Sequence, residues 1–396
     1  MNGTERHIYL DNSATTKICD EALKKYNEVS LLHFGNPSSL HAMGLDAEKE
    51  LRSAREAVLA SLSEKESTVI FTASGSEANN LAILGRAFAK ERYRRGAKII
   101  TTAGEHASVG EPFKKLSEYG FKTVEISTRN GMLDIDGLKR ELSPDVILVS
   151  IMMVNNETGA LYDVSEVSRL MRTSSPEALL HVDATQSYMK VKFTKRSLGA
   201  DMITLSSHKI EGPKGVGALV IDNKIIKNRG LAPLILGGGQ EGGLRSGTEN
   251  VPAVAAFGEA VRIGTREIDK RVEKISELRE YLIGKLKCEP TLSEIKITNP
   301  ERHAPHILNI TLPGIKSETA LHYLSSLGIY VSSGSACSSN SSHTSSALTA
   351  YGKSTEEADS SIRISLSHRN EKDELDALCA GLISATEKLA RIKWHR

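Results

Sequence analysis

Short apolar segments alternate with amphipathic segments over the first two thirds of the chain. Several of the short segments are apolar throughout, a pattern typical of parallel strands that are buried on both faces. Between them, apolar residues recur at helical spacing, as at Ala47, Leu51, Ala54 and Val58. This alternation predicts an α/β fold with a mainly parallel, seven-stranded sheet. We expect its strands at 68–72, 98–101, 122–126, 146–153, 179–183, 202–205 and 216–221.

The pattern changes after about residue 255. A long helical pattern runs to about residue 287, and an irregular stretch that contains prolines follows it. Two shorter strand patterns, at 307–312 and 362–366, precede a leucine-striped helix near the end of the chain. We therefore predict a large domain at 17–256 and a smaller α+β domain at 257–396, to which residues 1–16 also belong.

The composition argues against several classes of protein. Lysine plus arginine exceeds aspartate plus glutamate by 51 − 49 = 2, which gives no electrostatic case for binding nucleic acid or a membrane surface. The first residues lack the apolar core of a signal peptide, and no apolar run approaches the roughly 18 residues of a membrane span. Cys19, Cys288, Cys337 and Cys379 are far apart, which disfavours a zinc site or a disulfide framework. We expect a cytoplasmic protein without a bound metal.

Polar residues collect where the predicted strands end. Ligands bind at the carboxyl edge of an open parallel sheet. Small residues at 73–76 open a helix and would leave backbone N–H groups for a phosphate. His106, Asn156 and Asp183 follow or end three further strands, and Lys209 ends a Ser-Ser-His-Lys run after another. Taken singly, each residue has an ordinary explanation as a helix cap, a turn or a surface group.

Taken together, these residues suit pyridoxal phosphate. That cofactor needs an amine for its aldehyde, an acid for its ring nitrogen, a stacking group and a phosphate site. A lysine at the end of a buried strand, beside two hydroxyls and an imidazole, is placed like a Schiff-base lysine. Lys209 is therefore the candidate amine.

Longer motifs follow one another along nearly the whole chain. They are YLDNSATT at 9–16, FGNPSSLH at 34–41, NNETG at 155–159, HVDATQS at 181–187, SSHKIEGPKGVGAL at 206–219, GGGQEGGLRSGTENVP at 237–252, SSGSACSS at 332–339 and SIRISL at 361–366. This series resembles NifS/IscS-like cysteine desulfurases of the class V aminotransferase family. The resemblance implies a fold-type I pyridoxal phosphate enzyme, whose large domain binds the cofactor and whose small domain carries a catalytic cysteine loop.

The resemblance implies a role for each matching position around the cofactor. Lys209 would form the Schiff base, Asp183 would pair with the pyridine nitrogen, and His106 would stack on the ring and relay protons. Gln186 would hydrogen-bond the phenolic oxygen, with Asn156 on the same side of the site. The residues expected to hold the phosphate are Gly75, Ser76, Ser206 and His208, together with Thr248 of a neighbouring subunit in a homodimer.

The resemblance also implies a substrate and a reaction. Arg363 would bind the carboxylate of L-cysteine, and Asn36 and His41 would lie near the substrate. The thiolate of Cys337 would attack the substrate sulfur, which would leave alanine and a persulfide on Cys337. The persulfide would then pass to a sulfur acceptor, such as an iron–sulfur scaffold or a tRNA-thiolation protein.

The sequence departs from the resembling family at a few positions and leaves other functions open. Glu211 stands where an aromatic residue is common, and Thr158 replaces a common aliphatic residue. One alternative is a selenocysteine lyase or another class V enzyme, and a second is a cofactor-free scaffold that retains the fold. A third is a nucleotide-binding protein, because ALTAYGKS at 347–354 fits a loose phosphate-loop pattern. A helical pattern precedes Gly352, however, and predicts a helix C-cap there.

Overall fold

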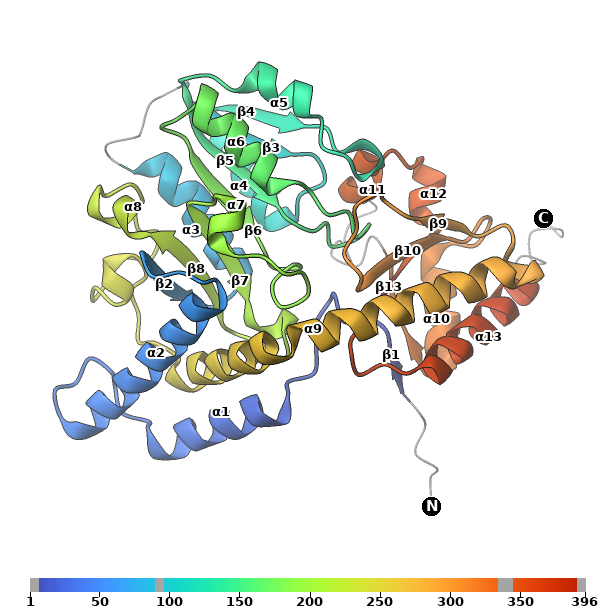
Figure 1. Ribbon diagram of the computed structural model, residues 1–396, viewed down its shortest axis with the longest axis horizontal. Helices are drawn as coiled ribbons and strands as arrows, with labels where there is room; N and C mark the ends of the chain where they lie inside the picture. Colours follow the sequence, from blue (N-terminus) through green and yellow to red (C-terminus); the bar gives the residue numbers. More distant parts are fainter. Residues whose placement is uncertain (1–6, 90–95, 334–344, 390–396) are drawn as a thin grey trace.

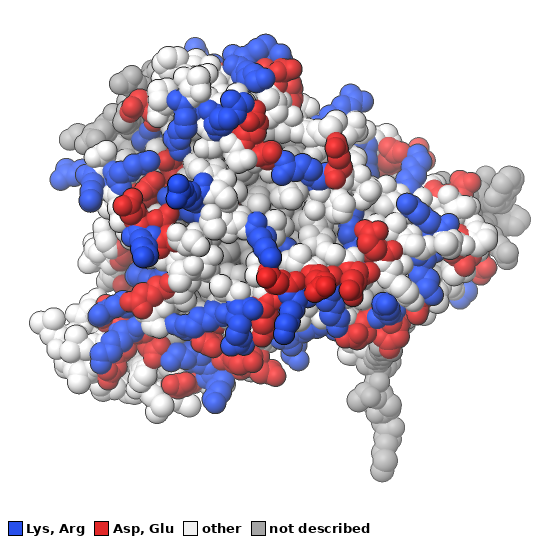
Figure 2. Space-filling model, viewed as in Figure 1, with Lys and Arg blue, Asp and Glu red and all other residues white. Residues whose placement is uncertain are grey.

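The computed structural model describes residues 7–89, 96–333 and 345–389. Figure 1 shows a larger α/β part and a smaller α+β part, which are joined by one long helix, α9 (Val251–Cys288). Lysine, arginine and acidic side chains are intermingled over the face drawn in Figure 2, in keeping with a net charge of +2.

The larger part is built on a seven-stranded sheet. All neighbouring strands are parallel except that β8 runs antiparallel to both of its neighbours. The predicted α/β fold with a mainly parallel sheet is therefore confirmed. In spatial order the strands are β2 (Ser67–Thr72), β8 (Gly217–Asp222), β7 (Met202–Ser206), β6 (Leu179–Asp183), β5 (Val146–Met152), β3 (Lys98–Thr102) and β4 (Lys122–Ile126).

Neighbouring residues of a strand enter two different cores, one on each face of the sheet. Leu148 lies in the core on one face and Val149 in the core on the other, because successive side chains alternate across a strand. Buried residues of α3 (Gly75–Phe88) and α4 (Ala107–Glu118) line the first core. The second core takes residues of α1 (Asp20–Leu32), α2 (Ala42–Ser61), α5 (Ile135–Glu141), α6 (Val164–Ser174), α7 (Lys195–Leu198) and the first half of α9.

The smaller part has an antiparallel sheet and a core of its own. In spatial order its strands are β12 (Ser332–Ser333), β13 (Ser361–Ser365), β10 (Ile307–Thr311) and β9 (Lys296–Thr298). This core includes residues of α10 (Ser317–Ser326), α13 (Lys372–Leu389) and the second half of α9. Near the N-terminus, β1 (Ile8–Tyr9) pairs in parallel with β11 (Ile329–Tyr330) and so joins the smaller part.

Helix α9 contributes to both cores without a break. Val254 and Phe257 lie in a core of the larger part, whereas Ile275 and Leu282 lie in the core of the smaller part. The predicted domain boundary between residues 256 and 257 falls within this helix and stays a prediction. Within the described ranges, no helix has both the length and the apolar character that crossing a membrane requires.

The predicted helix end at Gly352 is confirmed. Helix α11 (Ser346–Tyr351) ends there, and Gly352 adopts a left-handed conformation with φ 105°. Ser354 then caps the next helix, α12 (Thr355–Asp359). The ALTAYGKS stretch therefore spans a helix, a C-cap and a new N-cap, which is not the strand–loop–helix arrangement of a phosphate loop.

Candidate active site

A cavity of about 360 Å³ lies at the carboxyl ends of β5, β6 and β7. The N-terminal segment and strands β12 and β13 of the smaller part also reach it, so both parts of the molecule contribute to its walls. Ten of the residues predicted from the sequence line this cavity. They are Gly75, Ser76, His106, Asn156, Asp183, Gln186, Ser206, His208, Lys209 and Arg363.

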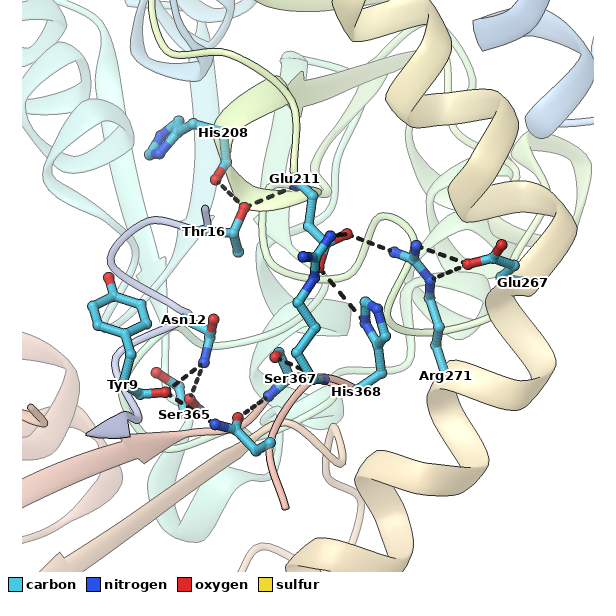
Figure 3. Close-up of polar contacts among 12 residues, drawn as sticks. Tyr9, Asn12, Thr16, His208, Glu211, Glu267, Arg271, Ser365, Ser367 and His368 are labelled. Atoms are coloured by element: carbon cyan, nitrogen blue, oxygen red, sulfur yellow. Dashed lines mark hydrogen bonds and ion pairs between the residues drawn. The ribbon is translucent and has the colours of Figure 1, made fainter. Parts of the chain in front are cut away.

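Lys209 is held by the N-terminal segment. It ends a short 3₁₀ turn, η2 (Ser207–Lys209), directly after β7. Its Nζ donates to the backbone oxygens of Ser13 and Ala14 over 2.5 and 2.8 Å. The turn itself is fixed by Thr16, whose hydroxyl donates to the backbone oxygen of His208 over 2.8 Å (Figure 3). These contacts place the amine inside the cavity on a well-anchored turn.

Asp183 is the buried carboxylate of the cavity. It is the last residue of β6, and its Oδ1 accepts from the backbone N–H of Thr185 over 2.9 Å. Its Oδ2 accepts from Nδ2 of Asn79 over 2.8 Å, and the same amide nitrogen donates to Oγ of Ser108 over 2.8 Å. A carboxylate fixed in this way is suited to a protonated ring nitrogen.

His106 presents a neutral imidazole to the cavity. It caps α4, and its Nδ1 accepts from the backbone N–H of Ser108 over 3.1 Å. Because Nδ1 is an acceptor there, a neutral ring carries its proton on Nε2. Burial lowers the pKa of His106, and the nearby Lys209 lowers it further, although Asp183 opposes both effects. The ring is therefore uncharged at neutral pH, which suits stacking on an aromatic cofactor.

The first turn of α3 forms a narrow anion cradle. The hydroxyl of Ser74 caps the helix by accepting from the backbone N–H of Glu77 over 3.1 Å. A Cβ atom added at Gly75 would lie 3.2 Å from Oγ1 of Thr185 and 3.3 Å from Cβ of Ser206. A larger residue would therefore fill the gap into which a phosphate would fit. The first N–H groups of a helix lack intrahelical partners and favour a bound anion.

Arg363 forms the opposite side of the cavity. It lies in β13, and its two terminal nitrogens donate to Oδ1 of Asp11 and to the backbone oxygen of Asn156, each over 2.9 Å. Its Nε is buried, and so is Oε1 of Gln186. Neither atom has a hydrogen-bond partner within the described part of the chain. Both residues line the cavity, so its walls hold polar atoms that a ligand can satisfy.

Two glutamates with raised pKa values lie at or next to this cavity. Glu157 lines it and accepts from the hydroxyl of Ser345 over 2.5 Å, and burial raises the pKa of Glu157 to about 7. Glu105 directly precedes His106 in the sequence, and burial raises its pKa to about 8. Its Oε1 accepts from the hydroxyl of Thr102 and the backbone N–H of Met152. Both carboxyls titrate well above the usual range of a glutamate.

Four predicted residues are not part of this arrangement. Asn36 and His41 lie on the exposed segment between α1 and α2, where His41 caps α2. Thr248 is exposed in the turn before α9. None of these three lines the cavity that the described residues form. Cys337 lies outside the described residues, so its predicted role stays a prediction.

Sequence reasoning missed several residues of the cavity. Asp11 and Ser13 belong to the YLDNSATT motif, which carried the resemblance, although no role was assigned to them. Asn79 was detectable, because it lies four residues after Gly75 and so on the same face of α3. Glu157 had no signal beyond its place beside Asn156 in the NNETG motif.

The cavity residues fit pyridoxal phosphate. Lys209 would supply the amine, Asp183 the acid for the ring nitrogen and His106 the flat neutral ring, while the Gly75 cradle would suit the phosphate. A mainly parallel sheet with this set of side chains at its carboxyl edge is the arrangement expected of a pyridoxal phosphate enzyme.

Comparison with known proteins identifies the family within that class. The chain matches the aminotransferase class-V family over residues 8–378 and belongs to it. This family depends on pyridoxal phosphate, so the predicted cofactor is confirmed.

Relatives resemble the chain over nearly its whole length. A protein named cysteine desulfurase IscS, from Dictyoglomus turgidum, is 36% identical over 394 residues, which cover 99% of this chain and 98% of the relative. A NifS/IcsS protein homolog from Lactobacillus delbrueckii subsp. bulgaricus is 38% identical, with coverage of 97% and 98%. The solved structure of a NifS-like protein is 34% identical with a TM-score of 0.88 and covers 96% of this chain and 100% of that one. The predicted resemblance is therefore confirmed.

Proposed function

We propose that the protein is a pyridoxal phosphate-dependent cysteine desulfurase. It converts L-cysteine to L-alanine and transfers the sulfur atom to Cys337. The observation that carries the proposal is one cavity that holds a lysine, a buried carboxylate and a guanidinium, in a chain 36% identical over 394 residues to a protein named cysteine desulfurase.

The side chains divide the reaction between them. Arg363 binds the substrate carboxylate, because a guanidinium suits bidentate pairing with a carboxylate. Bound pyridoxal phosphate supplies the electron sink for the substrate Cα. Nζ of Lys209 takes the proton from Cα, and neutral His106 offers an N–H donor in the same cavity.

Sulfur transfer is balanced without an external oxidant. The thiolate of Cys337 attacks the substrate sulfur, a sulfur–sulfur bond forms, and the substrate Cβ–S bond breaks. The electron pair of that bond stays on the substrate carbon skeleton, which takes up a proton and leaves as alanine. One thiol and one cysteine thus give one persulfide and one alanine.

The first experiment separates this mechanism from selenocysteine cleavage. Cys337→Ala should abolish sulfide release from L-cysteine while it spares selenide release from L-selenocysteine, because selenide can leave without the thiol. Cys288→Ala is the matched control, since Cys288 is an exposed free cysteine on α9. Undiminished cysteine activity in Cys337→Ala would contradict the proposed persulfide.

A second experiment locates the cofactor. Reduction of the loaded protein with borohydride and peptide mass spectrometry should place the pyridoxyl tag on Lys209. A tag on another lysine, or a protein that does not take up the cofactor, would reject the proposed site.

We further propose a homodimer in which Thr248 serves the site of the partner subunit. Two observations support it. Thr248 is exposed and lies outside the cavity of its own chain. Large apolar side chains are also exposed on the segment between α1 and α2, with Phe34 at 67% and Leu40 at 94%. Solvent exposure of such a group is typical of an interface.

Mixed dimers test this arrangement. A subunit with Lys209→Ala is combined with a subunit with Thr248→Val. If Thr248 acts across the interface, the hybrid keeps one complete site and about half of the activity expected of two sites. If Thr248 acts within its own chain, both sites are defective and the hybrid stays inactive.

We also propose a cytoplasmic enzyme that passes its persulfide to an iron–sulfur scaffold or a tRNA-thiolation protein. A persulfide carrier needs a reduced thiol, which a cytoplasmic location provides. Incubation with ³⁵S-labelled cysteine, followed by capture of the labelled acceptor, should identify the partner. Cell fractionation tests the location.

A further inference from the structure

Glu211 has no part in the proposed reaction, yet its carboxylate is buried between the two parts of the molecule. The residue is only 6% exposed and lies two positions after Lys209. Its φ of 67° is in the left-handed region, which is uncommon for a residue other than glycine. Burial and backbone conformation together indicate that surrounding contacts hold this residue in place.

Two arginines from outside the turn bind this carboxylate (Figure 3). Arg271, on α9, donates to Oε2 of Glu211 over 3.3 Å and also pairs with Glu267 over 2.9 Å. Arg369 follows β13 and donates through Nε to Oε1 over 3.0 Å and through a terminal nitrogen to Oε2 over 3.3 Å. Nδ1 of His368 lies 3.7 Å from Oε1, but burial lowers the pKa of His368, so the ring is a neutral neighbour.

These contacts connect the lysine that would hold the cofactor to the arginine that would bind the substrate carboxylate. Glu211 shares a turn with Lys209, and its backbone N–H donates to the hydroxyl of Thr16 over 2.8 Å. Arg369 lies six residues after Arg363 on the segment that leaves β13. The Glu211–Arg369 pair therefore ties the lysine turn of the larger part to the arginine strand of the smaller part.

A second tie runs along the N-terminal segment. Asp11 pairs with Arg363 over 2.9 Å, and the backbone N–H of Ser13 donates to Oγ of Ser365 over 2.8 Å. The backbone oxygen of Ser13 in turn accepts from Nζ of Lys209. Lys209 and Arg363 are thus linked directly through residues 11–13. Glu211 links the turn that carries Lys209 to the segment that follows the strand of Arg363.

We propose that Glu211 is a positioning residue that fixes the separation between Lys209 and Arg363. The proposal rests on the proposed function, because the amine of an α-amino acid would react with the cofactor that Lys209 holds, while its carboxylate, on the same carbon, would bind Arg363. The two groups therefore fit only one separation between the cofactor and Arg363. Loss of the Glu211 carboxylate would leave two arginines without their shared partner and would let the lysine turn and the arginine strand shift apart. Displacements of about 1 Å in a binding site are known to change rates by roughly a hundredfold.

The test compares a ligand that would reach both the cofactor and Arg363 with a ligand that would reach the cofactor alone. L-Alanine has an amine and a carboxylate, whereas ethylamine lacks the carboxylate. Equilibrium binding of each to the holoenzyme is followed by the change in cofactor absorbance, which requires no turnover. In Glu211→Gln we expect the Kd of L-alanine to rise at least about tenfold and the Kd of ethylamine to change less than about twofold.

Two further variants complete the experiment. Glu267→Gln is the matched control, because Glu267 binds the same Arg271 but lies on the surface of α9, and both Kd values should stay within about twofold of the starting protein. Arg369→Gln breaks the pair from the other side at a more exposed residue, and should reproduce the selective loss of alanine binding. This second variant decides the question if Glu211→Gln does not fold.

Two outcomes would overturn the proposal. In one, neither ligand binds differently in Glu211→Gln and Arg369→Gln; in the other, both ligands lose affinity equally, as expected if Glu211 only supports Lys209. Because neither ligand undergoes desulfuration, the comparison stays valid if the protein proves not to release sulfide. Failure of the positioning role and failure of the proposed activity are therefore distinguishable.

Discussion

Replacing Glu105 with glutamine should give a variant whose stability, relative to that of the starting protein, increases as the pH rises. Glu105 is only 8% exposed, and burial raises its pKa from 4.5 to about 8. For an acid whose pKa is higher in the folded state, the folded protein binds the proton more tightly. The protonated carboxyl therefore contributes to the free energy of unfolding. This contribution is complete below the unfolded-state pKa and is lost as the pH rises from about 4.5 to about 8. Glutamine resembles the protonated carboxyl and does not titrate.

The size of the effect follows from the displaced pKa. Between about pH 5.5 and pH 8.5, proton linkage lowers the free energy of unfolding of the protein with Glu105 by roughly 3 kcal/mol. The glutamine variant does not undergo this loss. A chain of 396 residues unfolds with an entropy of roughly 0.8 kcal/mol per kelvin, so 3 kcal/mol corresponds to about 4 °C. The amide oxygen can still accept from the hydroxyl of Thr102 and the N–H of Met152, so packing changes little.

The assay is thermal unfolding of both proteins, loaded with pyridoxal phosphate, across this pH range. We expect the difference in Tm, variant minus starting protein, to grow by about 4 °C from the acidic to the alkaline end. Glu111→Gln is the control for removing a negative charge at an exposed glutamate. A constant difference for Glu105→Gln would refute the reasoning, since it would mean that the carboxyl titrates as in the unfolded chain.

Three other substitutions test the cavity. Arg363→Lys keeps the charge but loses the planar fork, so the KM for L-cysteine should rise roughly tenfold or more with a smaller change in kcat, measured by steady-state kinetics. Gly75→Val places a branched side chain in the phosphate cradle, and the Kd for pyridoxal phosphate, measured by fluorescence titration, should rise at least about tenfold while Gly75→Ala has a smaller effect. Asn79→Ala removes the donor shared by Asp183 and Ser108 and should lower stability to urea by about 2 kcal/mol, whereas an unchanged midpoint would show that the two bonds contribute nothing.

Much of the larger part could be predicted from the sequence because its strands are continuous apolar runs. The predicted strands at 122–126 and 179–183 have the same bounds in the structure, and the other five differ by one residue at one or both ends. The ligand edge of a parallel sheet follows from topology, so residues placed after these strands converge on one cavity. The residues of the site that follow these strands could therefore be predicted from local sequence patterns alone.

Contributions from distant segments could not be predicted in this way. Asp11 and Ser13 reach the cavity because β1 pairs with a strand of the smaller part and the chain then crosses beneath Lys209. No periodicity signals such a path, since it depends on contacts between residues more than 300 positions apart. The raised pKa of Glu157 likewise arises from tertiary burial and not from its neighbours in sequence.

Helix α9 shows why a shift in composition did not mark a break in structure. The amino-acid pattern changes after about residue 255, yet the helix runs unbroken from Val251 to Cys288. A helical stripe can change the core that it faces without any change in its backbone, because each turn contacts only its own neighbours. The domain boundary predicted from composition therefore falls within a continuous helix and stays a prediction.

The pairing of β1 with β11 also has a consequence for synthesis on the ribosome. Ile8 emerges 321 residues before its partner Ile329, which at 5–20 residues per second is a delay of roughly 15 to 65 s. During that interval the leading end of the nascent chain has no strand to pair with, and the amine pocket lacks one of its walls. Activity can therefore begin only after Ile329 has been synthesised, and a chain released before that point would be inactive even with its larger sheet already formed.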